Sequence, residues 1–276
     1  SVTVRSYDSQ DALVMALRTG EVDAMYDYSN PISPTMLPSI SGVDGVDPGK
    51  GMNMGLFEIL FGFQKQPTDD LEFRRAVRYA LNYELLATTT GEGIISPAGI
   101  GYDDSLPKLV QDQEQAKAIL EAAGYVDTDG DGWRERPDGT PMDVLVTPQY
   151  NATKAALYQR IAEIIVTNLG EVGVKCTLDE ESIRNSDHEQ QLRDDGGYEI
   201  YICYATQGVS FYKTPFLYMF NDDLSMWGTC DLEDFDQAYN DMLNAQGDED
   251  YVAKVKELQR IASEEVIGIA LWWDTA

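Results

Sequence analysis

The sequence predicts an α/β fold, in which helices flank a mainly parallel mixed sheet. The clearest helix lies within residues 69–90, where apolar residues recur at helical spacing. It follows an apolar stretch, residues 52–63, that is typical of a buried strand. Further along, residues 142–147, 152–169 and 172–178 predict a strand, a helix and a strand with short connections. This order is typical of a parallel crossover unit.

The chain before residue 52 predicts two strands, one helix and a loop. Val2 and Val4 alternate with polar neighbours, which indicates a first strand. A helix over residues 11–18 ends near Gly20, because glycine adopts the left-handed conformation that closes helices. A second strand is expected over residues 22–28. Prolines and glycines then mark a loop up to residue 51.

The helix within residues 69–90 has a clear start, because Asp69 or Asp70 can cap it. Three of its arginines lie largely off the apolar stripe: Arg74, Arg75 and Arg78. The next helix, within residues 111–126, has Asp112 as its cap and Gly124 at its end.

The remaining elements follow from similar signals. Asn151 is expected to cap the helix over residues 152–169. After a polar segment, the chain predicts further elements in this order: a strand at 199–204, helices at 231–245 and 250–265, and an apolar strand at 266–273.

The composition excludes several kinds of function. The formal net charge of −28 argues against nucleic acid or an anionic membrane as a partner, since both need a basic surface. We interpret the charge as a solvated surface; attraction of cationic ligands is the alternative. The single histidine, His188, excludes a multi-histidine metal site. The cysteines fit no zinc spacing, and Cys176 and Cys203 are expected as buried thiols, with one disulfide as the alternative.

One acidic run has the spacing of a calcium loop. Asp127, Asp129 and Asp131 occupy its first, third and fifth positions, and a glycine follows at the sixth. Asp138 falls at the twelfth position, where a longer glutamate is normal. We favour an acidic surface turn over a structural calcium site, and no other cofactor is expected.

Polar and aromatic residues follow the ends of several predicted strands. In parallel sheets, ligands bind at the carboxyl ends of the strands. The candidate ligand-binding residues there are Tyr28, Asn30, Gln149, Tyr150, Asn151, Tyr204, Thr206 and Gln207. Their alternative explanation is ordinary capping and loop polarity.

Several segments carry a family resemblance. The helix segment D-L-E-F-R-R-A-V-R-Y-A-L-N resembles a signature of the family 5 extracellular solute-binding proteins, the capture subunits of ABC importers. A-L-R-T-G-E-V-D-A-M and Q-A-K-A-I-L-E-A-A-G-Y, followed by D-G-D-G, are similar to further family segments and occur in the family's order. One departure is Tyr204-Ala205-Thr206-Gln207, where peptide binders have a W-x-A-D-like motif. If Gln207 takes the Asp position, the salt bridge to a peptide's amino terminus is lost.

The resemblance implies one lobe of a type II periplasmic binding protein. Residues 1–276 would form a single lobe, the second of two, with both termini at severed connections to the first lobe. It implies no enzyme but extracellular or periplasmic capture of a solute, with a lipid anchor left open. Peptide is the expected solute, and the partners are the importer's membrane permease and the missing first lobe. The alternatives are an oligosaccharide or metal chelate, or a carboxylate-dependent hydrolase.

Overall fold

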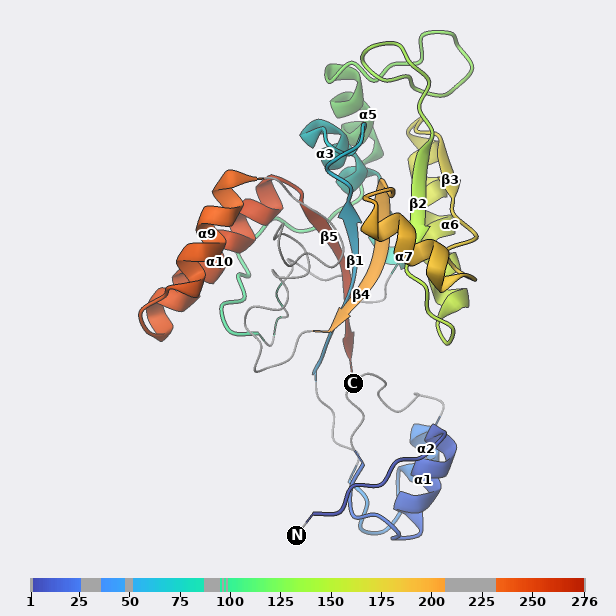
Figure 1. Ribbon diagram of the computed structural model, residues 1–276, viewed down its shortest axis with the longest axis vertical. Coiled ribbons are helices and arrows are strands. Elements are labelled where there is room, and N and C mark those ends of the chain that lie inside the picture. The colour runs from blue at the N-terminus through green and yellow to red at the C-terminus, as the bar shows by residue number, and fades with distance from the viewer. Residues whose placement is uncertain are drawn as a thin grey trace. The chain divides into compact units, whose positions relative to one another are not determined.

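The computed structural model describes residues 2–25, 36–47, 52–86, 95, 97, 99–206 and 232–275. The chain divides into two compact units (Figure 1). The first unit comprises Ser1–Asn53 and Asp274–Ala276, and the second comprises Met54–Trp273. The assignment of residues 1–276 to a single lobe stays a prediction.

The first unit contains the expected helix, whereas the described residues of the two expected strands are not in strands. Helix α1, Gln10–Arg18, is capped by Ser9, and the short helix α2 is Leu37–Ile40. Residues 2–7 form no strand, and Val2 and Val4 are 92% and 87% exposed. The prediction of a first strand is therefore wrong, because alternation alone supplies no hydrogen-bonding partner. Residues 22–25 also form no strand, and the rest of that predicted strand lies outside the described residues.

The second unit is built on a five-stranded sheet with the order β3-β2-β4-β1-β5. Strand β2 pairs in parallel with both β3 and β4. Strand β1 pairs antiparallel with β4, from Gly55 opposite Thr206 to Phe61 opposite Ile200. The sheet is therefore mixed, as predicted. The strands are β1 Met52–Phe61, β2 Val144–Pro148, β3 Cys176–Leu178, β4 Ile200–Thr206 and β5 Gly268–Thr275.

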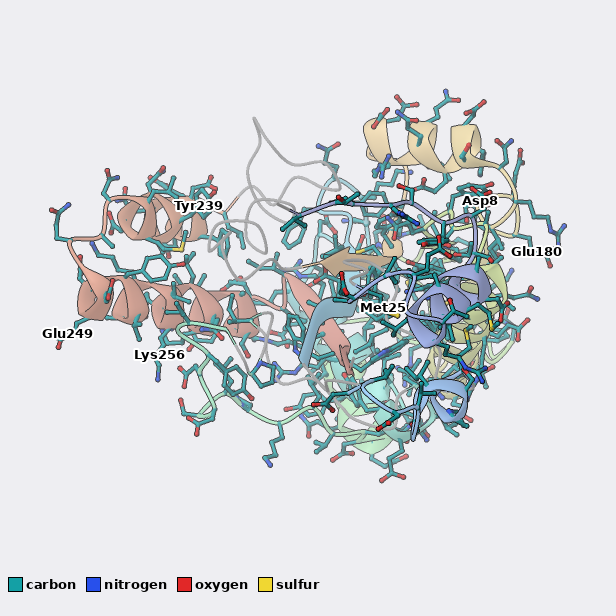
Figure 2. All side chains as sticks on the ribbon, turned by 90° about the horizontal axis from the view of Figure 1, so that it is seen from below. Asp8, Met25, Glu180, Tyr239, Glu249 and Lys256 are labelled. Atoms are coloured by element: carbon teal, nitrogen blue, oxygen red, sulfur yellow. The ribbon has the colours of Figure 1, made fainter. Side chains whose placement is uncertain are left out.

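Helices cover both faces of this sheet and enclose two apolar cores (Figure 1). Phe57 and Ile59 point into the core with α3 and α6, whereas Leu56 and Leu60 point into the core with α9 and α10. This alternation follows from the two-residue period of a strand. On α10, Glu249 and Lys256 point outwards (Figure 2). The helices are α3 Leu71–Ala80, α4 Tyr83–Leu86, α5 Gln113–Ala122, α6 Ala155–Glu171, α7 Ser186–Asp194, α9 Glu233–Leu243 and α10 Asp248–Glu264.

The helix predicted within residues 69–90 is shorter than its apolar pattern. Asp70 caps α3, and the helix ends at Ala80, where the next residue is extended. The side chain of Asn168 then accepts the backbone N–H of Asn82, a contact that no local pattern encodes. Arg74 is only 2% exposed, although it lies off the apolar stripe, because backbone carbonyl groups surround its guanidinium.

Two further differences concern α6 and α7. Helix α6 begins at Ala155, after Lys154 in the N-cap position, so the expectation that Asn151 caps it is wrong. The side chain of Asn151 instead accepts the N–H groups of Thr153 and Lys154 in a preceding turn. Helix α7 lies in a segment predicted only as polar. Its Glu189 accepts a hydrogen bond from the hydroxyl of Tyr201 on β4.

Candidate functional site

The carboxyl ends of β2, β3 and β4 lie at one edge of the sheet, because these strands run in parallel. Gln149 follows β2 directly and donates its backbone N–H to Ile202 O at 2.8 Å. Tyr204 lies near the end of β4. We call this edge the rim, and its described part is formed by Gln149, Tyr150, Asn151, Lys154 and Tyr204.

Gln149 holds the rim together. Its Oε1 accepts the Tyr158 hydroxyl at 2.9 Å and the backbone N–H of Tyr204 at 3.0 Å. One side chain thus links β2, α6 and β4. Two hydrogen bonds to one oxygen fix its rotamer, so Gln149 is a positioning residue as well as part of the rim.

Aromatic rings form the wall beside Gln149. The Phe57 ring is stacked on Trp272 with centroids 4.2 Å apart, and its centroid is 4.8 Å from that of Tyr204. The Tyr158 ring packs on Phe57 from α6. A Cβ atom at Gly55 would lie 2.0 Å from the Tyr204 hydroxyl. The glycine therefore leaves the space in which the Tyr204 ring lies across β1.

Lys154 is a rim residue that the sequence analysis missed. Its Nζ lies 4.1 Å from the Tyr204 ring centroid and 5.4 Å from that of Phe57. Within the described residues, its ammonium has no carboxylate partner. A lysine in the N-cap position opposes the helix dipole, since helix starts favour negative charge. Its aromatic partners come from β1 and β4, so no local pattern in the sequence signals this role.

The other predicted ligand-binding residues lie partly on the rim and partly outside the described residues. Tyr150 is half-buried, and Asn151 makes the local turn already described, as its alternative explanation expected. Thr206 ends β4, but its side chain is not among those described. Tyr28, Asn30 and Gln207 lie outside the described residues. Among the predicted residues that are described, Gln149 and Tyr204 are brought into direct contact.

The acidic loop between α5 and β2 brings together Asp127, Asp129, Asp131 and Glu135, whose carboxylate oxygens lie within 4.8 Å of one another. Both oxygens of Asp127 already accept backbone N–H groups, from Gly130 at 2.7 Å and Gly132 at 3.0 Å.

Glu135 accepts the hydroxyl and the N–H of Thr128, and these bonds lower the pKa of its carboxyl. Asp138 is not part of the group and bonds Thr140 instead. The preference for an acidic surface turn over a structural calcium site stays a prediction.

The sheet contains two cysteines and one buried carboxyl group. Cys176 and Cys203 are free thiols, as expected, but only Cys203 is buried, whereas Cys176 is half-buried; Cys230 lies outside the described residues. Glu58 on β1 is fully buried opposite Cys203, whose thiol donates to it at 3.7 Å. Burial raises the pKa of Glu58 to about 8, and the thiol contact only partly opposes this.

A family model described as "Bacterial extracellular solute-binding proteins, family 5 Middle" matches residues 1–226. The chain belongs to this family. The resemblance carried by the α3 and α5 segments is thereby confirmed. Family 5 proteins are extracellular binding proteins rather than enzymes.

The family 5 chain has curated relatives with different ligands in their names. The dipeptide-binding protein of Escherichia coli is 28% identical over 138 residues, 46% of this chain and 23% of that protein. Heme-binding protein A of Haemophilus influenzae is 28% identical over 133 residues, 46% of this chain and 22% of that protein. Di/tripeptide-binding protein 2 of Pseudomonas aeruginosa is 24% identical over 219 residues, 73% of this chain and 37% of that protein.

Solved structures show the same fold. NikA from Brucella suis in complex with Fe(III)-EDTA superposes with a TM-score of 0.73 at 19% identity, covering 98% of this chain and 55% of that one. The predicted fold class, that of a type II periplasmic binding protein, is confirmed. The family 5 chain spans about half the length of this solved relative. None of the helices in the described ranges is both long and apolar enough to cross a membrane.

Proposed function

We propose that this family 5 chain is the solute-capturing part of an ABC importer's binding protein, and that its solute is a peptide. The rim supplies half of the binding site, and the remainder of a longer protein closes over it. The observation that carries the proposal is Lys154, a cation beside the aromatic wall at the carboxyl ends of β2 and β4.

Lys154 suits the carboxylate of a peptide. Its ammonium rests on the face of Tyr204, which leaves donor hydrogens for a ligand. A carboxylate bonded to an ammonium is a charge-assisted pair, worth about 1.5–3 kcal/mol. In a chain of net charge −28, a free anion is repelled elsewhere, so the rim cation selects the orientation of the ligand.

The aromatic wall suits the body of the ligand. Tyr204 and Trp272 are half-buried and offer apolar faces to backbone or side-chain groups. Two of the relatives above are named for peptides, which favours this solute. Gln207, the candidate at the position of the family's Asp partner for a peptide's amino group, lies outside the described residues.

A non-peptide solute is the second candidate. A metal chelate that carries carboxylates would satisfy Lys154 equally well, and NikA holds Fe(III)-EDTA. An oligosaccharide would use the aromatic wall without the cation. A chelate would pair with Lys154, whereas an oligosaccharide would not, so substitution of Lys154 should weaken the binding of a chelate alone.

The other parts of the proposal follow from the family. We propose an extracellular or periplasmic location, a lipid anchor being one means of retention there, and the importer's permease as the membrane partner. Capture would proceed without turnover, as expected of a binding protein of family 5. No nucleic acid partner is proposed, because the net charge repels phosphates.

The test is calorimetric titration of the full-length protein with a peptide panel, each peptide with a free or an amidated carboxyl terminus. Amidation should weaken binding about tenfold to hundredfold, and Lys154→Met should do the same. The two changes should not add, because both remove one contact. Lys175→Met is the matched control, since Lys175 precedes β3 at the opposite edge and pairs with Asp143.

Equal affinity for amidated and free peptides would remove Lys154 from carboxylate recognition. If no peptide binds, the same titration with sugars and metal chelates decides between the alternatives. Binding of a chelate that Lys154→Met abolishes would replace peptide by a carboxylate-bearing chelate as the solute.

A further inference from the structure

We infer that Arg74 of α3 is a positioning residue for the rim, because it holds the junction of α10 and β5 and so decides which tryptophan of β5 faces Phe57. The inference rests on the proposed function only where it treats Trp272 as part of the solute site. The junction itself is a property of the unliganded chain.

The junction contains the one described non-glycine residue with a positive φ, Val266 at +46°. Helix α10 ends just before it, and the N–H of Ile267 turns back to Ala262 O at 3.1 Å. This pattern is a helix-closing motif in which glycine usually takes the left-handed position. A β-branched residue is strained there, and such strain persists only where neighbouring groups hold it.

Arg74 supplies the groups that hold this junction. Its Nε lies 3.2 Å from both Glu265 O and Val266 O, and its Nη2 lies 2.9 Å from Glu265 O. Its Nη1 donates to carbonyl groups of the loop before α3, at 2.8 and 3.0 Å. The guanidinium also lies 4.2 Å from the Phe63 ring centroid. A planar, many-donor group is needed to reach both segments at once.

The hydrophobic pattern of β5 hardly specifies the register of the strand, so contacts such as those of Arg74 are needed to fix it. Residues 266–273 are apolar or glycine throughout, so both faces of the strand accept them. A slip of one residue exchanges the two faces of a strand. Trp272 and Trp273 are neighbours, so a slip replaces one tryptophan by the other at the same place.

The start of β5 is therefore where its register is fixed. Gly268 contributes, since a Cβ atom there would lie 2.9 Å from Ile59 O. Val266, two residues earlier, contributes through Arg74. Together they direct Trp272 onto Phe57, 4.2 Å away, and leave Trp273 buried in the core on the other face.

The test is fluorine NMR of full-length protein labelled with fluorotryptophan, with Trp272 and Trp273 assigned by replacement with phenylalanine. Arg74→Lys should shift or split both resonances, and the affinity for the best-binding peptide should fall about tenfold. Val266→Gly in the same chain should restore the resonances, since glycine takes the left-handed conformation without strain. Arg78→Lys is the matched control, because Arg78 bonds Ser263 O of the same helix end but not Val266.

The resonances do not depend on the ligand, so they report on Arg74 even if no peptide binds. Unchanged resonances in a folded Arg74→Lys protein would overturn the inference, as would their failure to recover with Val266→Gly. If the Arg74→Lys protein does not fold, the inference requires that the double variant Arg74→Lys/Val266→Gly folds. Failure of both to fold beside a folded Arg78→Lys protein would show that Arg74 supports the whole sheet, and would also overturn it.

Discussion

Two sets of carboxylates in this chain have opposite environments: the single Glu58 on β1 and the acidic loop at residues 127–135. Glu58 is fully buried, and its Oε2 has no hydrogen-bond partner among the described residues. The loop carboxylates are mostly exposed and accept N–H groups from their own segment. Burial raises the pKa of Glu58, whereas hydrogen bonds lower that of Glu135. Acidic content alone therefore says little about stability; the contacts of each carboxylate decide its effect.

The largest expected effect concerns Glu58 and pH. The pKa of Glu58 in the folded chain, about 8, exceeds that of the unfolded chain, so the folded state binds more protons between these values. The free energy of unfolding should therefore fall as pH rises from about 5 to about 8, by up to about 1.4 kcal/mol for each pH unit. Glu58→Gln should remove most of this fall, and Glu199, whose pKa is also raised by burial, should account for the rest. Urea denaturation at several pH values would measure it.

Glu114→Gln provides the control for this comparison, because Glu114 is exposed on α5 and pairs only with Lys117. Its pH profile should follow that of the wild type. Parallel profiles for Glu58→Gln and the wild type would show that Glu58 finds water or another partner in solution.

A smaller effect is expected from salt, and it tests the exposed carboxylates as a group. With a net charge of −28, the folded chain repels itself, and ions screen that repulsion. The melting temperature should rise by several degrees between about 0.1 and 1 M sodium chloride. Chloride is used because sulfate would also strengthen apolar burial. A melting temperature that falls with salt would mean that the surface ion pairs outweigh the repulsion.

The smallest effect is expected at the acidic loop. Asp127→Asn keeps an acceptor for one of the two N–H groups, of Gly130 and Gly132, and loses the other bond at an exposed turn, so the free energy of unfolding should fall by only about 1 kcal/mol. Added calcium should shift the melting temperature by less than the change in salt does, because the loop satisfies its own carboxylates. A large calcium-dependent shift that Asp127→Asn abolishes would instead establish a structural calcium site.

The parts of the fold that could be predicted are those with local causes. Helix α5 follows its prediction because Asp112 caps it and Gly124 closes it, both within a few residues. Helix α7 was missed because its polar sequence docks through Glu189 and Tyr201, which come from different elements. Arg74 was expected off the core because the carbonyl groups that bury it come from Glu265 and Val266, far along the chain.

The residues of the candidate site also divide into those with local signals in the sequence and those without. Gln149 and Tyr204 could be found because strand ends are visible in the sequence. Lys154 could not, because its aromatic partners come from β1 and β4. The contacts that give a rim residue its chemistry are long-range, and single-sequence periodicity carries no information about them.

The two hydrogen bonds that Gln149 accepts have a consequence for how tightly a solute can be held. They immobilise the Tyr158 hydroxyl and the backbone N–H group of Tyr204 before any solute binds. Less conformational entropy is then lost at the rim when a solute binds there, as proposed. A rigid rim discriminates between solutes by their shape. A solute that does not fit must itself change conformation, and the free energy of that change weakens its binding.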